Sequence, residues 1–222
     1  MMSKVSILAV IISFGVSALL GPVLIPWLRR LKVGQTVRED GPAEHLKKNG
    51  TPTMGGILIL LAVSVTSLIF LEDYPQTAPI LFLTVGFGLV GFVDDYIKVV
   101  CRRSMGLSPV QKLAGQLLIT GIFACYLLKF TDVSLAMRVP FGHGMFWNFG
   151  AWNLPVLFFI VLGTVNGVNF TDGLDGLAGS VTVIVAVFFT AVAAGMGSGL
   201  EPVTSVVAGA LLGFLLFNVY PA

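Results

Sequence analysis

The sequence predicts an all-α, polytopic membrane protein. Hydrophobic residues make up 56% of the 222 positions and charged residues only 11%. This composition is typical of helices that face lipid and is unlike that of soluble domains. The apolar residues also gather into long runs separated by polar loops, as expected for helices that each need about 20 residues to cross a bilayer. We therefore expect one integral-membrane domain over residues 1–222.

Seven apolar runs are candidates for these helices. They cover residues 5–28, 54–71, 78–93, 110–130, 153–168, 178–195 and 202–219. The first run is too long for the core of a signal peptide, so we expect it to be retained as a helix. In the last run, Gly209 and Gly213 have the GxxxG spacing that allows close helix packing, although this spacing alone is a weak signal in a glycine-rich membrane chain.

The basic residues predict which helix ends face the cytoplasm. Ten of the 13 lysines and arginines lie in or beside the loop after the first helix and the loop after the third, which leaves Lys4, Lys129 and Arg138 for the other side. By the positive-inside rule, these two loops and the stretch 166–179 are cytoplasmic. The N-terminus is then external and the C-terminus cytoplasmic. The aromatic-rich segment 131–152 becomes an external hairpin at the membrane interface.

Cysteine and histidine offer little chemistry in this sequence. The spacing of Cys101 and Cys125 indicates neither a disulfide nor a zinc site. His143 lies among glycines with no second candidate ligand nearby, so we expect it at the surface or the interface rather than on a metal.

The stretch Asn166–Gly179 is a polar, glycine-rich interruption between two apolar runs. Two amides and two carboxylates recur in it at every third position, and these are Asn166, Asn169, Asp172 and Asp175. Three steps of three residues end on the opposite face of a straight helix, so the row is not a simple stripe. The glycines indicate that the chain leaves one helix, turns and enters another, and the four polar groups would then converge. The alternative is an ordinary interfacial turn with an aspartate as helix cap.

A second polar group ends the third predicted helix, in the sequence GFVDDYIK of residues 91–98. Asp94 and Asp95 repel each other and require a cation or a shared proton. Lys98 can pair with Asp94 if the helix continues. The functional interpretation is a carboxylate that acts as a base or faces a magnesium–phosphate complex. The alternative is a helix-end ion pair with one solvated neighbour.

The cytoplasmic loop before the second helix supplies further donors. Lys47, Lys48, Thr51 and Thr53 could bind a phosphate or a polar head group, although charges in such loops usually serve topology. Lys112 is directed at the same membrane face. Carboxylates that hold a divalent metal beside lysines that hold phosphates are what phosphoryl transfer requires. The residues therefore suggest a membrane-embedded transferase that acts on phosphate.

Three motifs together resemble the polyprenyl-phosphate N-acetylhexosamine-1-phosphate transferase family. They are REDGPAEHLKKNGTPTMGG, GFVDDYIK and NGVNFTDGLDGLAG, in that order and at matching membrane positions. The first motif is similar to the branch of the family that transfers phospho-N-acetylmuramoyl-pentapeptide. The resemblance covers essentially the whole chain.

The resemblance implies an enzyme of peptidoglycan synthesis. Undecaprenyl phosphate would attack the β-phosphate of UDP-N-acetylmuramoyl-pentapeptide with the help of Mg²⁺, giving lipid I and UMP. The expected location is the bacterial inner membrane, with the active site on the cytoplasmic face. Membrane lipid is an expected partner, a homodimer is one option, and nucleic acid is not expected.

The resemblance also implies roles for individual residues. Asp94, Asp95 and Lys98 match the catalytic positions, with Asp94 activating the lipid phosphate. Lys112, like Lys98, matches a lysine near the phosphates. The positions that match substrate contacts are Lys48, Thr53, Lys112, Asn169, Asp172, Gly173, Leu174, Asp175 and Asn218.

The chain differs from the family in its extent. Members have about ten helices, whereas we expect seven here, so the chain corresponds to the N-terminal two-thirds of the family's catalytic domain. The family's magnesium-binding aspartate and histidine cluster would lie beyond Ala222. From this we expect the 222 residues alone to be inactive, with no assigned metal ligand.

Other functions compete with this interpretation. A different polyprenyl-phosphate sugar-1-phosphate transferase would share most of the motifs. A membrane transporter would also contain acids and broken helices, but these usually lie near the bilayer midplane and often in repeats, whereas here they lie at helix ends. A non-catalytic lipid-binding or assembly protein is the third alternative.

Overall fold

Seven α-helices form the bulk of the molecule in the computed structural model, which describes residues 4–30, 54–101, 103, 105–139 and 142–219. They are α1 (Lys4–Arg30), α3 (Gly56–Ile69), α4 (Thr77–Val99), α5 (Pro109–Phe130), α6 (Asn153–Thr171), α7 (Leu177–Met196) and α8 (Glu201–Asn218). Six of them are long and apolar enough to cross a membrane, and α3 is a shorter apolar helix of 14 residues. The seven predicted helices and the all-α membrane fold are confirmed.

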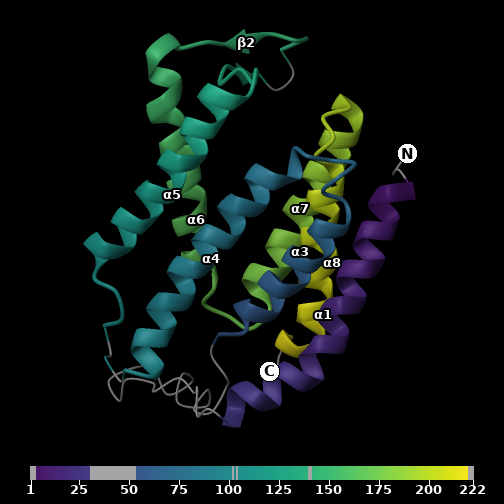
Figure 1. The fold of residues 1–222 in the computed structure, drawn as a ribbon, viewed down its shortest axis with the longest axis vertical. Helices are drawn as coiled ribbons and strands as arrows, with labels where there is room; N and C mark the ends of the chain where they lie inside the picture. Colours follow the sequence, from purple (N-terminus) through teal and green to yellow (C-terminus); the bar gives the residue numbers. More distant parts are fainter. Residues whose placement is uncertain (1–3, 31–53, 102, 104, 140–141, 220–222) are drawn as a thin grey trace.

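The helices run alternately between two ends of the molecule (Figure 1). A small antiparallel hairpin lies at one end, where β1 (Met137–Arg138) pairs with β2 (Phe146–Trp147). The short 3₁₀ helix η1 (Gly150–Trp152) follows it, and the aromatic rings of Phe146, Trp147 and Trp152 are exposed. The predicted aromatic hairpin is therefore present. The C-terminal ends of α1, α4, α6 and α8 lie at the opposite end.

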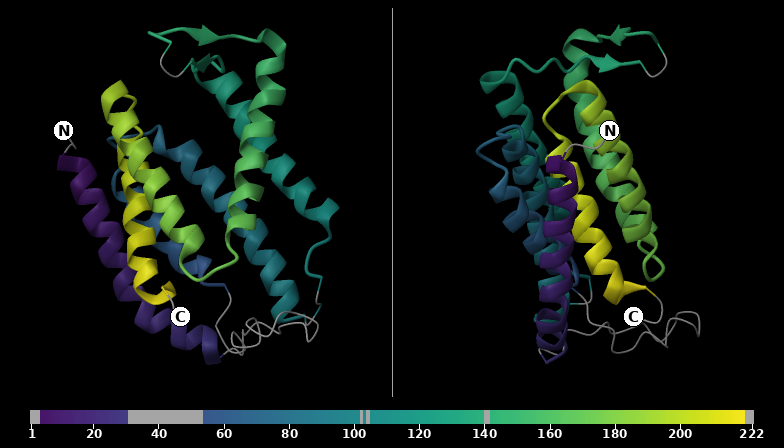
Figure 2. Two further views of the ribbon diagram at one scale, coloured as in Figure 1. Left: turned by 180° about the vertical axis from the view of Figure 1, so that it is seen from behind. Right: turned by 90° about the vertical axis from the view of Figure 1, so that its right-hand side faces the viewer.

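Helices α1, α3, α7 and α8 form the densest part of the bundle, here called the packed group. Helix α8 lies between α1 and α7 (Figure 2). A side chain at Gly209 would collide with the backbone of Val10, and one at Gly213 would lie 2.6 Å from Ser17 Cβ. Only glycine permits this approach, so the GxxxG spacing does bring two helices together. Ser13 Oγ adds a hydrogen bond of 2.7 Å to the Val206 carbonyl oxygen.

Helices α4, α5 and α6 form a looser outer group. Helix α4 packs on α3 and α5, and α5 packs on α6. None of the residues of the membrane-spanning window of α6 is buried, whereas half of those in α8 are. The outer group carries most of the charged residues predicted for the site.

Two helices continue beyond their predicted ends. Helix α4 ends at Val99 rather than at residue 93, because Lys98 pairs with Asp94 one turn earlier and stabilises the last turns. Helix α6 ends at Thr171 rather than at residue 168. The loops at this end of the bundle are correspondingly shorter than predicted.

Helix α5 begins with a capping box. Ser108 Oγ accepts a hydrogen bond from the Gln111 backbone N–H at 3.2 Å, and Gln111 Oε1 accepts one from the Ser108 N–H at 3.0 Å. Pro109 occupies the first turn, where its missing N–H costs nothing. The cap fixes the start of α5, and so places Lys112 in its first turn.

Candidate functional site

Asp94 is the centre of a buried ionic cluster near the C-terminal end of α4. The residue is only 4% exposed. Its Oδ2 atom accepts a hydrogen bond from Lys98 Nζ at 2.6 Å and another from Lys112 Nζ at 2.9 Å. Lys98 lies one turn further along α4, and Lys112 comes from α5. The predicted pairing of Asp94 with Lys98 is confirmed, and the structure adds the second lysine.

The loop between α4 and α5 covers the other oxygen of this carboxylate. The backbone N–H of Leu107 donates to Asp94 Oδ1 at 2.9 Å. Gly106 has a φ of +59°, and a Cβ there would lie 2.5 Å from Asp94 Oδ1 and 2.7 Å from Lys98 Cε. Glycine is therefore required at this position for two reasons: the backbone is in the left-handed region, and there is no room for a Cβ atom. Sequence reasoning missed Gly106 and Leu107, although a glycine in a tight polar loop beside two lysines was a usable signal.

Asp95 has different surroundings from Asp94. Its side chain is 41% exposed, and its Oδ1 atom lies 3.7 Å from Lys98 Nζ, a loose ion pair. The two lysine side chains are also partly accessible, Lys98 at 40% and Lys112 at 31%. The cluster thus presents one open carboxylate and two ammonium groups beside a carboxylate whose oxygens are already occupied.

The turn 172–176 between α6 and α7 forms a second candidate region. Asn218, the last residue of α8, accepts a hydrogen bond from the Gly176 N–H through its Oδ1 atom at 3.1 Å. Gly176 has a φ of +75° and opens α7. The predicted residues Asn169, Asp172, Gly173 and Leu174 are exposed, and Asp175 is half-buried. This turn therefore offers backbone groups and an exposed carboxylate, and it is attached to the packed group through Asn218.

Asn166 pairs with a neighbouring helix rather than with the turn 172–176. Asn166 and Asn169 both remain in α6, where residues three apart lie on neighbouring positions of the helix surface, so the helix alone does not separate them. Asn166 instead pairs with Gln116 of α5 through two hydrogen bonds, 3.0 and 3.3 Å long. Our prediction that all four side chains converge is wrong for Asn166. Sequence reasoning also missed Gln116, although it lies one helical turn after Lys112 on the same face of α5.

Two predicted site residues, Lys48 and Thr53, lie outside the described residues. Apart from Asn169 in the last turn of α6, the remaining ones fall into two sets. Asp94, Lys98 and Lys112 are brought together by direct contacts, with Asp95 next to them. The turn 172–176 and Asn218 form the other set.

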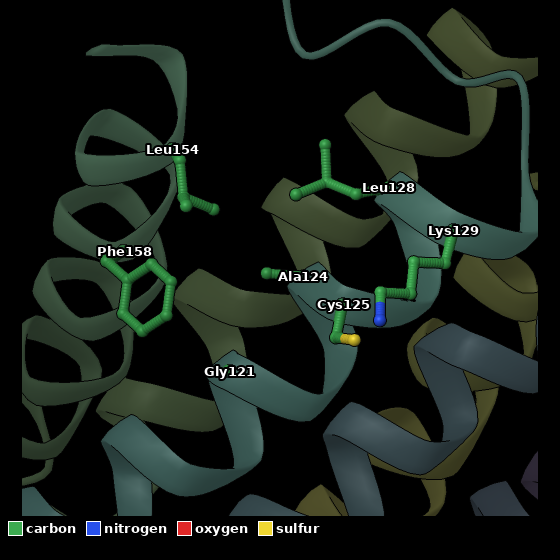
Figure 3. A pocket seen from close by; sticks show the side chains of 7 residues that line it. All are labelled: Gly121, Ala124, Cys125, Leu128, Lys129, Leu154 and Phe158. Atoms are coloured by element: carbon green, nitrogen blue, oxygen red, sulfur yellow. The ribbon is translucent and has the colours of Figure 1, made fainter. Parts of the chain in front are cut away.

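A cavity of about 220 Å³ lies elsewhere, between α5 and α6 (Figure 3). It is lined by Gly121, Ala124, Cys125, Leu128, Lys129, Leu154 and Phe158. Lys129 is in the last turn of α5, whereas Lys112 is in the first, so the cavity and the ionic cluster are at opposite ends of this helix. The lining is mostly apolar, and Lys129 is the one charged side chain among these seven residues, which is few polar groups for a nucleotide site.

A helical membrane protein with lysines, carboxylates and a glycine-rich turn at one end of its bundle has the groups that bind phosphorylated substrates. Residues 77–222 match the sequence model of the family described as glycosyl transferase family 4. Residues 48–60 match the model of signature 1 of the phospho-N-acetylmuramoyl-pentapeptide-transferases. The chain therefore belongs to glycosyl transferase family 4, within its phospho-N-acetylmuramoyl-pentapeptide transferase branch. This membership argues against the transporter alternative.

Individual relatives are similar along nearly all of the chain. It is 48% identical over 215 residues to a phospho-N-acetylmuramoyl-pentapeptide-transferase of Acetivibrio thermocellus, with 96% of the chain and 64% of the relative covered. Equally named relatives from Geobacillus sp. and Bacillus subtilis are 44% and 42% identical, with 100% of the chain and 69% of each relative covered. The chain thus spans about two-thirds of the length of these relatives.

Proposed function

We propose that this chain takes part in the transfer of phospho-N-acetylmuramoyl-pentapeptide from its UDP-activated form to undecaprenyl phosphate, giving lipid I and UMP. The observation that carries the proposal is the pair of lysines on Asp94, whose Nζ atoms lie 2.6 and 2.9 Å from one carboxylate oxygen. Two fixed, partly accessible cations at the ends of membrane helices suit a diphosphate that meets a lipid phosphate. The relatives are named for the transferred group, phospho-N-acetylmuramoyl-pentapeptide, and the family resemblance implies the UDP-activated donor and the undecaprenyl phosphate acceptor.

The reaction needs one bond to form and one to break. An oxygen of the lipid phosphate attacks the β-phosphorus of the UDP substrate, and the bond from that phosphorus to the bridging oxygen breaks. UMP leaves with the bridging oxygen and its electron pair. Negative charge builds up on the transferred phosphoryl group and on the leaving UMP. Lys98 and Lys112 are the described cations of the ionic cluster that can stabilise this charge.

The two aspartates suit different roles. Three donors already occupy the oxygens of Asp94, which favours a role in holding both lysines. Asp95 is the open carboxylate, and it can face the lipid phosphate. The assignment of Asp94 as the activating group, which the family resemblance implies, stays a competing prediction.

Mg²⁺ is the cofactor that the family implies. No group of three or more histidine, cysteine, aspartate or glutamate side chains in the described part of the chain could form a closed site. A Mg²⁺ ion that is bound mainly by substrate phosphates needs only one or two carboxylates, and the partly exposed Asp95 fits that requirement. When bound, the ion would neutralise charge on the diphosphate.

The turn 172–176 is our proposed binding region for the nucleoside. Its exposed Asp172 and its backbone groups can form hydrogen bonds to a base and a ribose, and Asn218 holds Gly176 in place. Asn169, Gly173, Leu174 and Asp175 belong to the same proposed region, as do Lys48 and Thr53.

The sidedness of the membrane is part of the proposal. Ten of the 13 basic residues lie in or beside the loops that follow the first and the third predicted helix, and the ionic cluster adjoins the second of these loops. By the positive-inside rule, this end of the bundle lies on the cytoplasmic side of the bacterial inner membrane. The exposed native Cys101 should then react with an impermeant maleimide from the cytoplasmic side, and a cysteine at the exposed Ser134 only from the outside. The control is Cys101→Ser. If each cysteine instead reacted from the opposite side of the membrane, the proposed orientation would be wrong.

Turnover is tested by UMP release from UDP-N-acetylmuramoyl-pentapeptide, undecaprenyl phosphate and Mg²⁺ in detergent. The assay uses the 222-residue chain and a chimera that joins it to the portion of the Bacillus subtilis relative that the match does not cover. We expect the chimera to release UMP only when both substrates are present. A folded chimera that binds the UDP substrate but releases no UMP would overturn the proposal.

Variants of the chimera separate the roles of the aspartates. If Asp94 holds the lysines, Asp94→Asn weakens binding of the UDP substrate by about tenfold, and Asp95→Asn lowers kcat by about 100-fold with little change in binding. If Asp94 is the activating group, Asp94→Asn removes turnover and leaves binding intact. Titration calorimetry and initial rates distinguish the two patterns.

A further inference from the structure

Gln116 and Asn166 form a reciprocal amide pair between α5 and α6. The Asn166 Nδ2 group donates to Gln116 Oε1 at 3.0 Å, and the Gln116 Nε2 group donates to Asn166 Oδ1 at 3.3 Å. A second donation, from Asn166 Nδ2 to the Leu162 carbonyl oxygen at 2.8 Å, fixes the orientation of the amide. Gln116 is 4% exposed. Each amide therefore satisfies the other in surroundings where an unpaired one would be costly.

The pair joins two helices that carry different parts of the candidate site. On α5, Gln116 follows Lys112 by four residues, one helical turn. On α6, Asn166 precedes the end of the helix at Thr171, after which the turn 172–176 begins. The pair is thus a direct side-chain link from the helix that supplies a lysine to the helix that supplies the nucleoside turn.

Within the described residues of this chain, which spans about two-thirds of the length of its relatives, helix α6 makes few other contacts. None of the residues of its membrane-spanning window is buried, and it packs sparsely on α5 and α7. Apolar contacts between membrane helices have little directional preference, because lipid tails provide similar contacts. Two hydrogen bonds between amides, by contrast, fix both the rotation of α6 and its height along α5.

We propose that Gln116 and Asn166 are positioning residues that set the distance between the turn 172–176 and the lysines of the ionic cluster. A UDP substrate spans both places, with its uridine at the turn and its diphosphate at Lys98 and Lys112. The pair would hold the two places in a fixed relation to each other, so that binding at one favours binding at the other. This inference rests on the proposed function.

The binding experiment uses the 222-residue chain and two ligands. Gln116→Leu and Asn166→Leu should each weaken binding of UDP-N-acetylmuramoyl-pentapeptide by about tenfold. The affinity for uridine, which needs the turn alone, should change by less than about twofold, because the turn itself is intact. Thr164→Leu, at an exposed position of α6, is the control and should change neither. Partial unfolding alone would lower the number of sites in calorimetry and leave both affinities unchanged.

Two double variants separate positioning from stability. The exchange Gln116→Asn with Asn166→Gln keeps both amides and should restore affinity for the UDP substrate to within about threefold of the parent chain. The double leucine variant should recover thermal stability, because no amide is left unpaired. Its affinity for the UDP substrate should stay low, because two leucines fix neither the rotation of α6 nor its height along α5. Full recovery of that affinity in the double leucine variant would overturn the inference.

A distance measurement tests the inference without any ligand. Spin labels are attached at Cys101 and at Gly173→Cys in a Cys125→Ser background. The distance distribution should be narrow in the parent and broad in each leucine variant. Unchanged distributions would overturn the inference, as would a loss of substrate affinity in Asn166→Leu but not in Gln116→Leu, which would indicate direct substrate contact by Asn166. If the parent binds neither ligand but the distributions change as expected, the proposed function fails and the positioning role stands.

Discussion

The contact between α1 and α8 and the contact between α5 and α6 solve the same packing problem differently. In the first, Gly209 and Gly213 bring α8 against the backbone of α1, and half of the spanning residues of α8 are buried. In the second, no spanning residue of α6 is buried, and the amides of Gln116 and Asn166 connect the helices. The first contact depends on shape and the second on hydrogen bonds.

The difference distinguishes the part of the bundle that stabilises the fold from the part that carries the candidate site. Close packing of small residues gives a contact that is dense, dry and resistant to movement. The outer group is packed less densely, and the side chains of Lys98 and Asp95 on α4 are partly accessible there. The packed group therefore supplies stability, and the outer group presents the charged residues.

The largest effect should come from filling the α1–α8 contact. Gly209→Val places a side chain against the Val10 backbone and should lower the free energy of unfolding by about 3 kcal/mol. Gly195→Val is the matched control, since no atom lies within 4 Å of a Cβ at this position in α7. Thermal unfolding in detergent measures both variants. Equal effects would show that the α1–α8 contact is no denser than its surroundings.

A smaller and more local effect is expected at Gly106. Gly106→Ala and Gly150→Ala share a φ of +59°, so both incur about 1 kcal/mol of backbone strain. Only Gly106→Ala also pushes on Asp94 and Lys98. It should therefore weaken binding of the UDP substrate by a further factor of about ten, whereas Gly150→Ala should not. If calorimetry finds the same affinity in both variants, the loop does not hold the ionic cluster.

The smallest effect should come from the hydrogen bond across the packed group. Ser13→Ala removes the bond to the Val206 carbonyl oxygen and should cost about 0.6 kcal/mol of unfolding free energy. Ser180→Ala, at an exposed position of α7, is the control. A loss as large as that of Gly209→Val would mean that polar bonds, rather than close approach, hold α1 to α8.

The sequence by itself determined the class of protein, the seven helices and the motifs of the site. These properties depend on local patterns, namely apolar runs of membrane-spanning length and charged residues between them. The Asp94–Lys98 pair was also predictable, because residues four apart on a helix are always neighbours.

Only the tertiary structure decided which groups meet across the helices. Lys112 reaches Asp94 from 18 positions away, Gln116 meets Asn166 across 50 positions, and Asn218 holds Gly176 across 42. The tilt and rotation of whole helices set such contacts, and the apolar pattern of any one helix leaves both free, because lipid satisfies its faces as well as a neighbouring helix does. For this reason the residues of the ionic cluster were predictable from the sequence. The loop residues Gly106 and Leu107 that cover Asp94, and the pairing of Gln116 with Asn166, were not.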